Sequence, residues 1–453
     1  MKTETALIAL LIAICTALSF LLFARTRFSI KPSEGKLWPL LLYREYILIF
    51  LPLILVQEYG IESFPHALFF VRNDNTFFIS LISILSIFLY SAAAGITARL
   101  TSITTIHNSS VQPNSDDSTL IFATAAITLA LLVFTIAISF LGYKHAFIYA
   151  LTTGENVLTA RLENVYSSNL PSQLSQVITI GWWIAAIQSG LLIYRRKLLF
   201  GATFLILAFL LSSANGGKAP PLMCITLAIL SYAVAARPKM RISRLLIFGP
   251  ILTALIFFLL FWITALQIPN LDLETYLAFL VNRLGIGQMS GVFETFSIDR
   301  LRGDFYLHTI PFASLFLDYP TYDKQLMLFT EGADFSRTGV KNSLFISEAY
   351  GIGGWLLASL SPIIVGVSYG VGSYLLHFSM KIFFGPNVAA VYALPIYLLS
   401  SPLTGGFSSF IFFKGLILTL LIIFPIFILF HALKLLGNSS RSNPRRLTYN
   451  LTP

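Results

Sequence analysis

Charged residues are scarce in this sequence: only 11% of its 453 residues are Asp, Glu, Lys or Arg. A soluble chain carries roughly a quarter charged residues. Hydrophobic residues make up 56% of the chain, and its mean hydropathy is +0.79. The charge deficit extends along the whole sequence, which excludes a hidden soluble domain. We therefore expect a single membrane domain over residues 1–453.

Cysteine is nearly absent as well, and the common enzyme motifs are missing. Cys15 and Cys224 both lie in apolar runs, which excludes a disulfide framework and favours a packing role. The chain has no P-loop, HExxH helix, GxSxG elbow or Cys–His site. We expect no bound metal and no other cofactor.

The excess of positive charge does not indicate a nucleic-acid partner. The formal net charge is +10, but the cations sit in short clusters between apolar runs. That distribution is typical of membrane topology. The expected partner is the lipid bilayer, and no nucleic acid is expected.

Long apolar runs predict an all-α polytopic membrane protein. A helix needs about 20 apolar residues to cross the hydrocarbon layer. About eleven stretches meet this requirement, and the first is interpreted as a retained helix, not a cleaved signal peptide. They are residues 5–24, 38–56, 77–98, 119–142, 175–194, 198–213, 219–236, 245–267, 344–376, 387–403 and 409–435.

The distribution of Lys and Arg predicts the orientation. Every second loop is basic, including the Arg195–Lys197 turn and the C-terminal tail. The positive-inside rule then gives an outside N-terminus and a cytoplasmic C-terminus. It also gives two outer loops, residues 143–174 and a large, partly helical loop of residues 268–343. Within the large loop, the polar stretch TYDKQLMLFTEGADFSRTG is expected to lack regular structure.

Few ionisable side chains fall inside the predicted helices. Arg44 and Glu45 lie near the start of the second helix, and Glu348 begins the ninth. Adjacent residues on a helix do not share a face, so no buried Arg44–Glu45 pair is expected. Glu348 has two open interpretations, a carboxylate that faces the helix dipole or a general base.

Cations gather near the membrane on the predicted outer side. Guanidinium groups bind phosphate oxygens bidentately, and an ammonium binds them as a point charge. Gly216 and Gly217 would let backbone N–H groups approach an anion. Such residues would suit a lipid-linked pyrophosphate, but from the residues alone the interpretation as ordinary loop cations is favoured. The cations are Arg161, Lys218, Arg283, Arg300 and Arg302, and His308 is a further candidate in the large loop.

Three stretches, taken in order, carry a family resemblance: LLSSANGGKAPPLMCITLAI, ETYLAFLVNRLGIGQMSGVFETFSIDRLRGDFYLHTIP and KNSLFISEAYGIGGWLLASLSPIIVGV. With the topology, they resemble the bacterial Wzy-type oligosaccharide repeat-unit polymerases, which include the enterobacterial common antigen polymerase. Lys218 departs from the Arg usual in relatives, and no RX10G pattern follows Arg161, Arg283 or Arg302. The ligase-type HX10G pattern fails at His308, which favours polymerase over ligase.

The resemblance implies a GT-C-like helical architecture in the bacterial inner membrane. It also implies an inverting, metal-independent glycosyl transfer at the periplasmic face, which extends O-antigen or a related surface polysaccharide. The donor glycan is carried on undecaprenyl pyrophosphate, the acceptor is a lipid-linked repeat unit, and a chain-length regulator is a further suggested partner. Fixed cations would stabilise the departing pyrophosphate.

The resemblance also implies roles for individual residues. The catalytic candidates are Arg283, Glu348 and His308; the substrate-binding candidates are Arg161, Lys218, Arg300, Arg302, Gly216 and Gly217. Arg283 is expected to contribute most among the cations, because aromatic residues precede it and glycines follow it. Two alternatives stay open: an O-antigen ligase or other lipid-linked-sugar transferase, and a non-enzymatic flippase or transporter.

Overall fold

The computed structural model of the chain is all-helical, with no β-strand in the part that it describes. That part comprises residues 2–31, 37–64, 71, 75–102, 115–140, 143–154, 157, 172–214, 219–236, 254, 257–258, 261–262, 264–265, 271–309, 321–332, 341–385, 403–410 and 414–441.

Long helices dominate this part of the chain. They are α1 (Thr3–Phe23), α2 (Pro39–Tyr59), α3 (Thr76–Ser102), α4 (Ser115–Phe140), α7 (Ser172–Tyr194), α8 (Leu198–Ser213), α9 (Ala219–Ala236), α14 (Phe345–Phe384) and α16 (Lys414–Arg441). Short helices fill the predicted loops. They are η2 (Ile61–Ser63), α5 (Ala146–Thr153), α11 (Leu273–Leu280), η4 (Val281–Gly285), η5 (Ile286–Gln288), α12 (Ser290–Thr295), η6 (Phe305–Thr309), α13 (Tyr322–Glu331) and η10 (Phe407–Ser409).

Five helices are long and apolar enough to cross a membrane, by length and composition. They are Thr3–Phe23, Pro39–Tyr59, Thr76–Thr101, Ser118–Phe140 and Phe345–Phe384. This supports the predicted membrane character. The larger number of about eleven spans, and the architecture implied with it, stay predictions; most of the predicted spans 245–267 and 387–403 lies outside the described residues.

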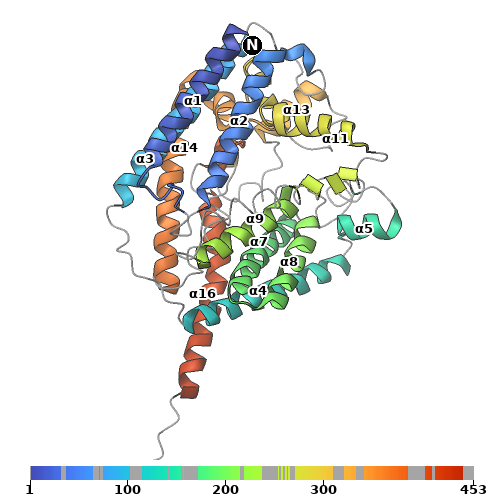
Figure 1. The fold of residues 1–453 in the computed structure, drawn as a ribbon, viewed down its shortest axis with the longest axis vertical. Helices are drawn as coiled ribbons and strands as arrows, with labels where there is room; N and C mark the ends of the chain where they lie inside the picture. The colour runs from blue at the N-terminus through green and yellow to red at the C-terminus, as the bar shows by residue number, and fades with distance from the viewer. Residues whose placement is uncertain are drawn as a thin grey trace, which may run out of the picture.

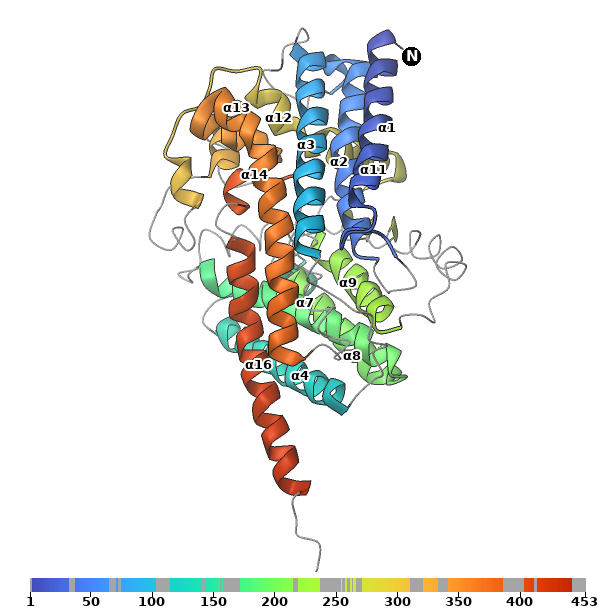
Figure 2. The same cartoon turned by 90° about the vertical axis from the view of Figure 1, so that its left-hand side faces the viewer.

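The long helices form two groups, as Figures 1 and 2 show. Helices α1, α2, α3 and α14 stand side by side in one group, and α4, α7, α8 and α9 pack together in the other. Helix α16 contacts both α4 and α14. Small residues allow the closest approach within the first group. A Cβ added at Gly366 would lie 2.5 Å from the carbonyl oxygen of Tyr90 in α3, which is typical of membrane helix packing.

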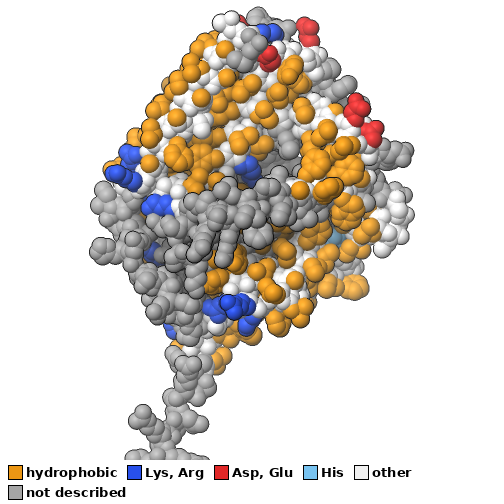
Figure 3. Space-filling view, viewed as in Figure 1, with side chains coloured by type: hydrophobic (Ala, Val, Ile, Leu, Met, Phe, Trp, Pro, Cys, Tyr) orange, Lys and Arg blue, Asp and Glu red, His pale blue; other side chains and the backbone are white. Residues whose placement is uncertain are grey.

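The surface of the described helices is largely apolar. Figure 3 shows hydrophobic side chains over most of one face, with Lys and Arg confined to a few small groups. Large exposed residues such as Leu21 in α1, Leu85 in α3 and Leu356 in α14 contribute to this surface. A surface of this kind suits contact with lipid rather than water.

The N-terminus and part of the 268–343 segment lie at the same end of the first group. Helices α12 and α13 are near the start of α1, the end of α2 and the start of α3 in Figures 1 and 2. This arrangement matches the expectation that the N-terminus and the large loop share one side. Which side of a membrane that is remains a prediction.

Candidate functional site

Helix α14 is interrupted at Gly354, where φ is +64° and ψ is −156°. This backbone conformation is essentially restricted to glycine. The ring of Tyr90 in α3 contacts both Phe345 and Tyr369, with centroid distances of 6.4 and 6.0 Å. A straight helix would separate those two α14 residues by about 36 Å, at 1.5 Å per residue. Residues 345–353 therefore fold back against the helix bundle as a separate short helix.

The guanidinium of Arg300 caps this short helix. Its Nη2 donates to the carbonyl oxygens of Gly351 and Ile352 at 3.0 and 2.8 Å, and its Nε donates to Gly351 at 3.2 Å. Carbonyls at the end of a helix lack intrahelical donors, so these hydrogen bonds satisfy groups that the interruption leaves open. Arg300, predicted to bind substrate, here stabilises the backbone next to Gly354.

Glu348 lies on the short helix and is buried, with 1% of its surface exposed. Its Oε2 accepts a hydrogen bond from the backbone N–H of Ser408 at 2.7 Å. Gly406 is in such close contact that an added Cβ would collide with the same oxygen. The carboxylate is thus held by the 403–410 segment.

A second carboxyl group, that of Asp323 in the first turn of α13, lies close enough to Glu348 for the two charges to interact. Ser343 Oγ donates a hydrogen bond to Asp323 Oδ1. Burial raises the pKa of Asp323 to about 7, and the negative charge of Glu348 adds to the shift, whereas the Ser343 hydrogen bond opposes it. Near neutral pH both its protonated and its ionised forms are therefore populated, which suits a general acid or base.

Close packing joins α13 to the short helix. A Cβ added at Gly351 would lie 2.5 Å from the ring of Tyr322, whose hydroxyl donates to Thr295 Oγ1 at 2.9 Å. Ser347 precedes Gly351 by one helical turn, so it lies on the same face. Its hydroxyl is buried and has no hydrogen-bond partner among the described residues. We call Asp323, Ser343, Ser347 and Glu348 the carboxyl site.

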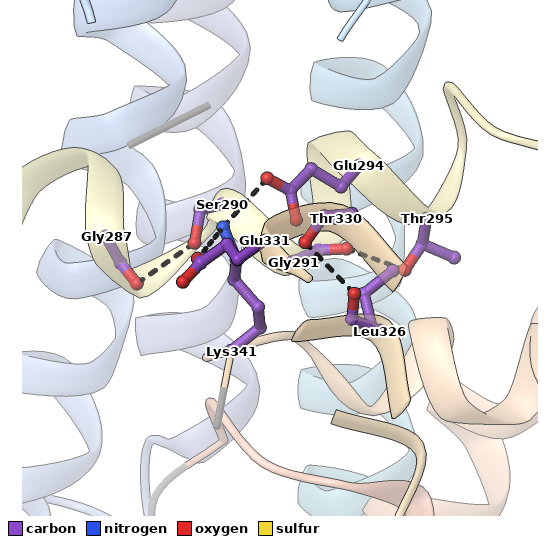
Figure 4. Close-up of polar contacts among 9 residues, drawn as sticks. All are labelled: Gly287, Ser290, Gly291, Glu294, Thr295, Leu326, Thr330, Glu331 and Lys341. Atoms are coloured by element: carbon purple, nitrogen blue, oxygen red, sulfur yellow. Dashed lines mark hydrogen bonds and ion pairs between the residues drawn. The ribbon is translucent and has the colours of Figure 1, made fainter. Parts of the chain in front are cut away.

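An ion-pair cluster joins α12, α13 and Lys341, two residues before Ser343 of the carboxyl site. Lys341 Nζ lies 2.9 Å from Glu294 Oε1 and 2.6 Å from Glu331 Oε1. Figure 4 shows the lysine side chain between the two carboxylates, which come from α12 and α13. Lys341 and Glu294 are buried, with 6% and 0% of their side chains exposed. The cluster fastens α12 and α13 to the chain that leads into α14.

One further ion pair, between neighbouring residues of α2, bears on a prediction. Arg44 Nε donates to Glu45 Oε1 at 3.1 Å, and the Arg44 Nη2 group forms an ion pair with the same oxygen. Glu45 is 1% exposed, and Thr404 Oγ1 lies 3.4 Å from its other oxygen. No buried pair was predicted here; the two neighbours do pair, with Glu45 buried and Arg44 partly exposed, because the long arginine side chain curls around the helix to reach the adjacent carboxylate.

The polar stretch after Thr321 was expected to lack regular structure; this was wrong for Tyr322–Glu331, which forms α13, and residues 333–339 lie outside the described part. Sequence reasoning missed Asp323 for this reason. A signal was present: Thr321 followed by an acidic residue two positions later is a common helix start. The apolar residues Tyr322, Leu326 and Phe305 form a small buried cluster that stabilises this helix.

The remaining predicted site residues divide into three sets. Arg302 is exposed and makes no hydrogen bond or ion pair with the described residues. Arg283 lies in η4 and His308 in η6, but their side chains lie outside the described part. The rest fall on residues outside it altogether: Arg161, Gly216, Gly217 and Lys218. Of the predicted residues, the structure therefore brings together Arg300 and Glu348: Arg300 donates to the end of the short helix that carries Glu348.

The carboxyl site offers proton exchange and hydroxyl groups, which suit a polyhydroxylated ligand. Within the described ranges, no group of three or more His, Cys, Asp or Glu residues is placed to hold a metal ion. No protein-family model, curated protein or solved structure matches the chain, so its function is inferred from its own residues and their geometry.

Proposed function

We propose that the chain is a metal-independent glycosyltransferase that polymerises undecaprenyl-pyrophosphate-linked oligosaccharide repeat units at the periplasmic face of a bacterial inner membrane. The observation that carries the proposal is the pair of carboxyl groups, Asp323 and Glu348, held beside the interruption of α14. Glu348 lies in the third stretch that resembles the repeat-unit polymerases, and Asp323 lies between the second and third stretches.

The reaction needs a base and a site for a departing anion. A hydroxyl of the acceptor sugar attacks the anomeric carbon of the donor while its bond to pyrophosphate breaks. A carboxylate that titrates near neutral pH is suited to take the hydroxyl proton. The outer cations, with Arg283 foremost, are proposed to stabilise the charge that develops on the pyrophosphate.

A deletion strain and a purified protein test this proposal together. Deleting the gene should leave lipid-linked repeat units unpolymerised, so that these can be extracted and supplied to the full-length protein in detergent. Polymer should form with the wild type and with Glu274→Gln, an exposed carboxyl in α11, and should be reduced but measurable with Glu348→Gln. Long glycan in the deletion strain, or no polymer from the wild-type protein, would refute the proposal.

A second candidate, a flippase or transporter of lipid-linked oligosaccharide, is favoured by two observations. Broken helices and buried intramembrane carboxylates are common at transport sites, and this chain has both, at Gly354 and Glu45. Detergent distinguishes the two candidates. A polymerase extends glycan in micelles, whereas a transporter acts only between two compartments and leaves the repeat units unchanged.

A further inference from the structure

The two carboxyl groups of the site differ in their access to a ligand. Glu348 is 1% exposed, and the backbone of residues 403–410 encloses its Oε2. Asp323 is only partly buried as a whole residue, so the chain keeps some exposed surface at this position. A group that exchanges a proton with substrate must come within hydrogen-bond distance of it. Of the two residues, Asp323 is the one that keeps exposed surface.

Asp323 is also held in a fixed position. Ser343 Oγ donates to its Oδ1, and the backbone N–H of Lys341 donates to its carbonyl oxygen at 3.3 Å. Among the described residues, no donor engages its Oδ2. One carboxylate oxygen is thus oriented by the protein, and the other is left for a ligand hydroxyl.

Two further polar atoms lie on the elements that carry Asp323 and Glu348. The buried Ser347 hydroxyl and the buried Oε1 of Gln325 both lack hydrogen-bond partners in the described part of the chain. Buried polar groups in native structures are normally satisfied, so such atoms indicate a ligand or water that completes the site. A sugar, with several hydroxyl groups, supplies both donors and acceptors to them.

The charges around Asp323 are set by the elements packed against α13. Glu348 on the short helix contributes a negative charge that raises the pKa of Asp323, and Ser343 contributes the hydrogen bond that lowers it. Tyr322 precedes it on α13, and its own pKa is raised by burial. Lys341 is engaged by Glu294 and Glu331.

We propose that Asp323 is the residue that accepts the proton of the acceptor sugar's hydroxyl, and that the charge of Glu348 tunes its proton affinity. This inference rests on the proposed glycosyl transfer. The hydroxyl oxygen forms a bond to the anomeric carbon, and the bond from that carbon to the pyrophosphate oxygen breaks. Pyrophosphate leaves with the electron pair, the hydroxyl proton moves to Asp323, and water later removes it.

The pH dependence of chain elongation tests the assignment, because Glu348 and Ser343 shift the pKa of Asp323 in opposite directions. The substrate is the lipid-linked repeat unit extracted from the deletion strain, supplied to full-length protein in detergent between pH 5 and 9. The wild-type rate should rise with pH through the pKa of Asp323. Glu348→Gln removes a like charge, so any residual activity should show this rise at lower pH. Ser343→Ala removes the stabilising hydrogen bond, so the rise should move to higher pH.

Asp323→Asn should lower the rate by about 10²–10⁴-fold, the usual contribution of a general base, while Asp323→Glu should restore part of it. Thermal unfolding of each variant identifies any loss of fold. The opposite pH shifts of Glu348→Gln and Ser343→Ala test the role of Asp323 even if Asp323→Asn does not fold. Full activity of Asp323→Asn, or an unmoved pH profile in both neighbour variants, would refute the role of Asp323 alone. Absence of polymer from the wild type at every pH would refute the glycosyl transfer itself.

Discussion

Arg300 reaches across 51 residues of sequence to donate two hydrogen bonds to the carbonyl oxygen of Gly351. The contact links the 268–343 segment to the interrupted helix α14. A helix that stops beside a glycine exposes carbonyl groups, and a planar guanidinium satisfies several of them at once. The geometry of Glu348, one turn earlier on the same short helix, therefore depends on a residue outside that helix.

Replacing Arg300 should destabilise the short helix. Arg300→Ala leaves the carbonyls of Gly351 and Ile352 without these donors, at a cost of about 1–3 kcal/mol. Arg300→Lys retains one ammonium, so its stability should lie between that of the wild type and that of Arg300→Ala. Thermal unfolding of the purified variants measures the effect, with the exposed Arg302→Ala as the control. Equal stability of Arg300→Ala and Arg302→Ala would contradict the capping role.

Gly354→Ala should impair the protein more than Gly385→Ala. Both glycines have positive φ, +64° and +85°, so both substitutions strain the backbone. Only at Gly354 would the new Cβ also approach Arg300, at 3.1 Å from Nη1. We expect Gly354→Ala to lose about 1–3 kcal/mol of stability from the backbone alone, with a further loss of chain elongation. Elongation equal to that of Gly385→Ala would show that the interruption is not part of the site.

The sequence predicted the apolar helices well, because a long apolar run determines a helix locally. Residues 5–24 and 38–56, for example, correspond to α1 (Thr3–Phe23) and α2 (Pro39–Tyr59). The carboxyl site was harder to predict. Asp323 and Ser343 are 20 residues apart, and only the fold of α13 onto the short helix brings them together. A helix of ten residues such as α13 has too few periods for its pattern to stand out from a loop.

The Arg44–Glu45 pair should respond asymmetrically to substitution. Glu45 is almost fully buried, whereas 40% of the Arg44 side chain is exposed. Arg44→Leu leaves a buried carboxylate without its cation, which costs about 3–5 kcal/mol. Glu45→Leu leaves an arginine that can turn toward its exposed side, so the loss should be smaller. Thermal unfolding of both variants and of the double variant tests the order, and an Arg44→Leu protein more stable than Glu45→Leu would contradict it.

Asp323 should make the protein less stable as the pH rises. Its pKa is about 7 in the folded chain, compared with an ordinary value of 3.8. Between these values the folded state binds more protons than the unfolded state, so the free energy of unfolding falls with increasing pH. Asp323→Asn cannot titrate and should flatten the decline between about pH 4 and 7. Unfolding temperatures across that range check it, and an unchanged slope in Asp323→Asn would assign the decline to another group.

Lys341 should be the residue on which the ion-pair cluster depends most. In Lys341→Met, Glu294 and Glu331 lose their shared ammonium and face each other as like charges near a buried position. Burial and like charge both raise a carboxyl pKa, so the folded variant should hold a proton that the unfolded chain releases. Its stability should therefore fall as the pH rises from about 4 to 8, more steeply than that of the wild type.

Two comparisons isolate the cause of that fall. Adding Glu294→Gln to Lys341→Met removes the buried carboxylate and should restore most of the stability at high pH. Lys144→Met, which removes an exposed lysine, controls for the loss of one positive charge and should leave the slope unchanged. If Lys341→Met is as stable as Lys144→Met at every pH, the ion-pair cluster does not hold α12 and α13 against residues 341–344, which precede α14. The position of Asp323 would then have to depend on Ser343 and the apolar cluster around Tyr322.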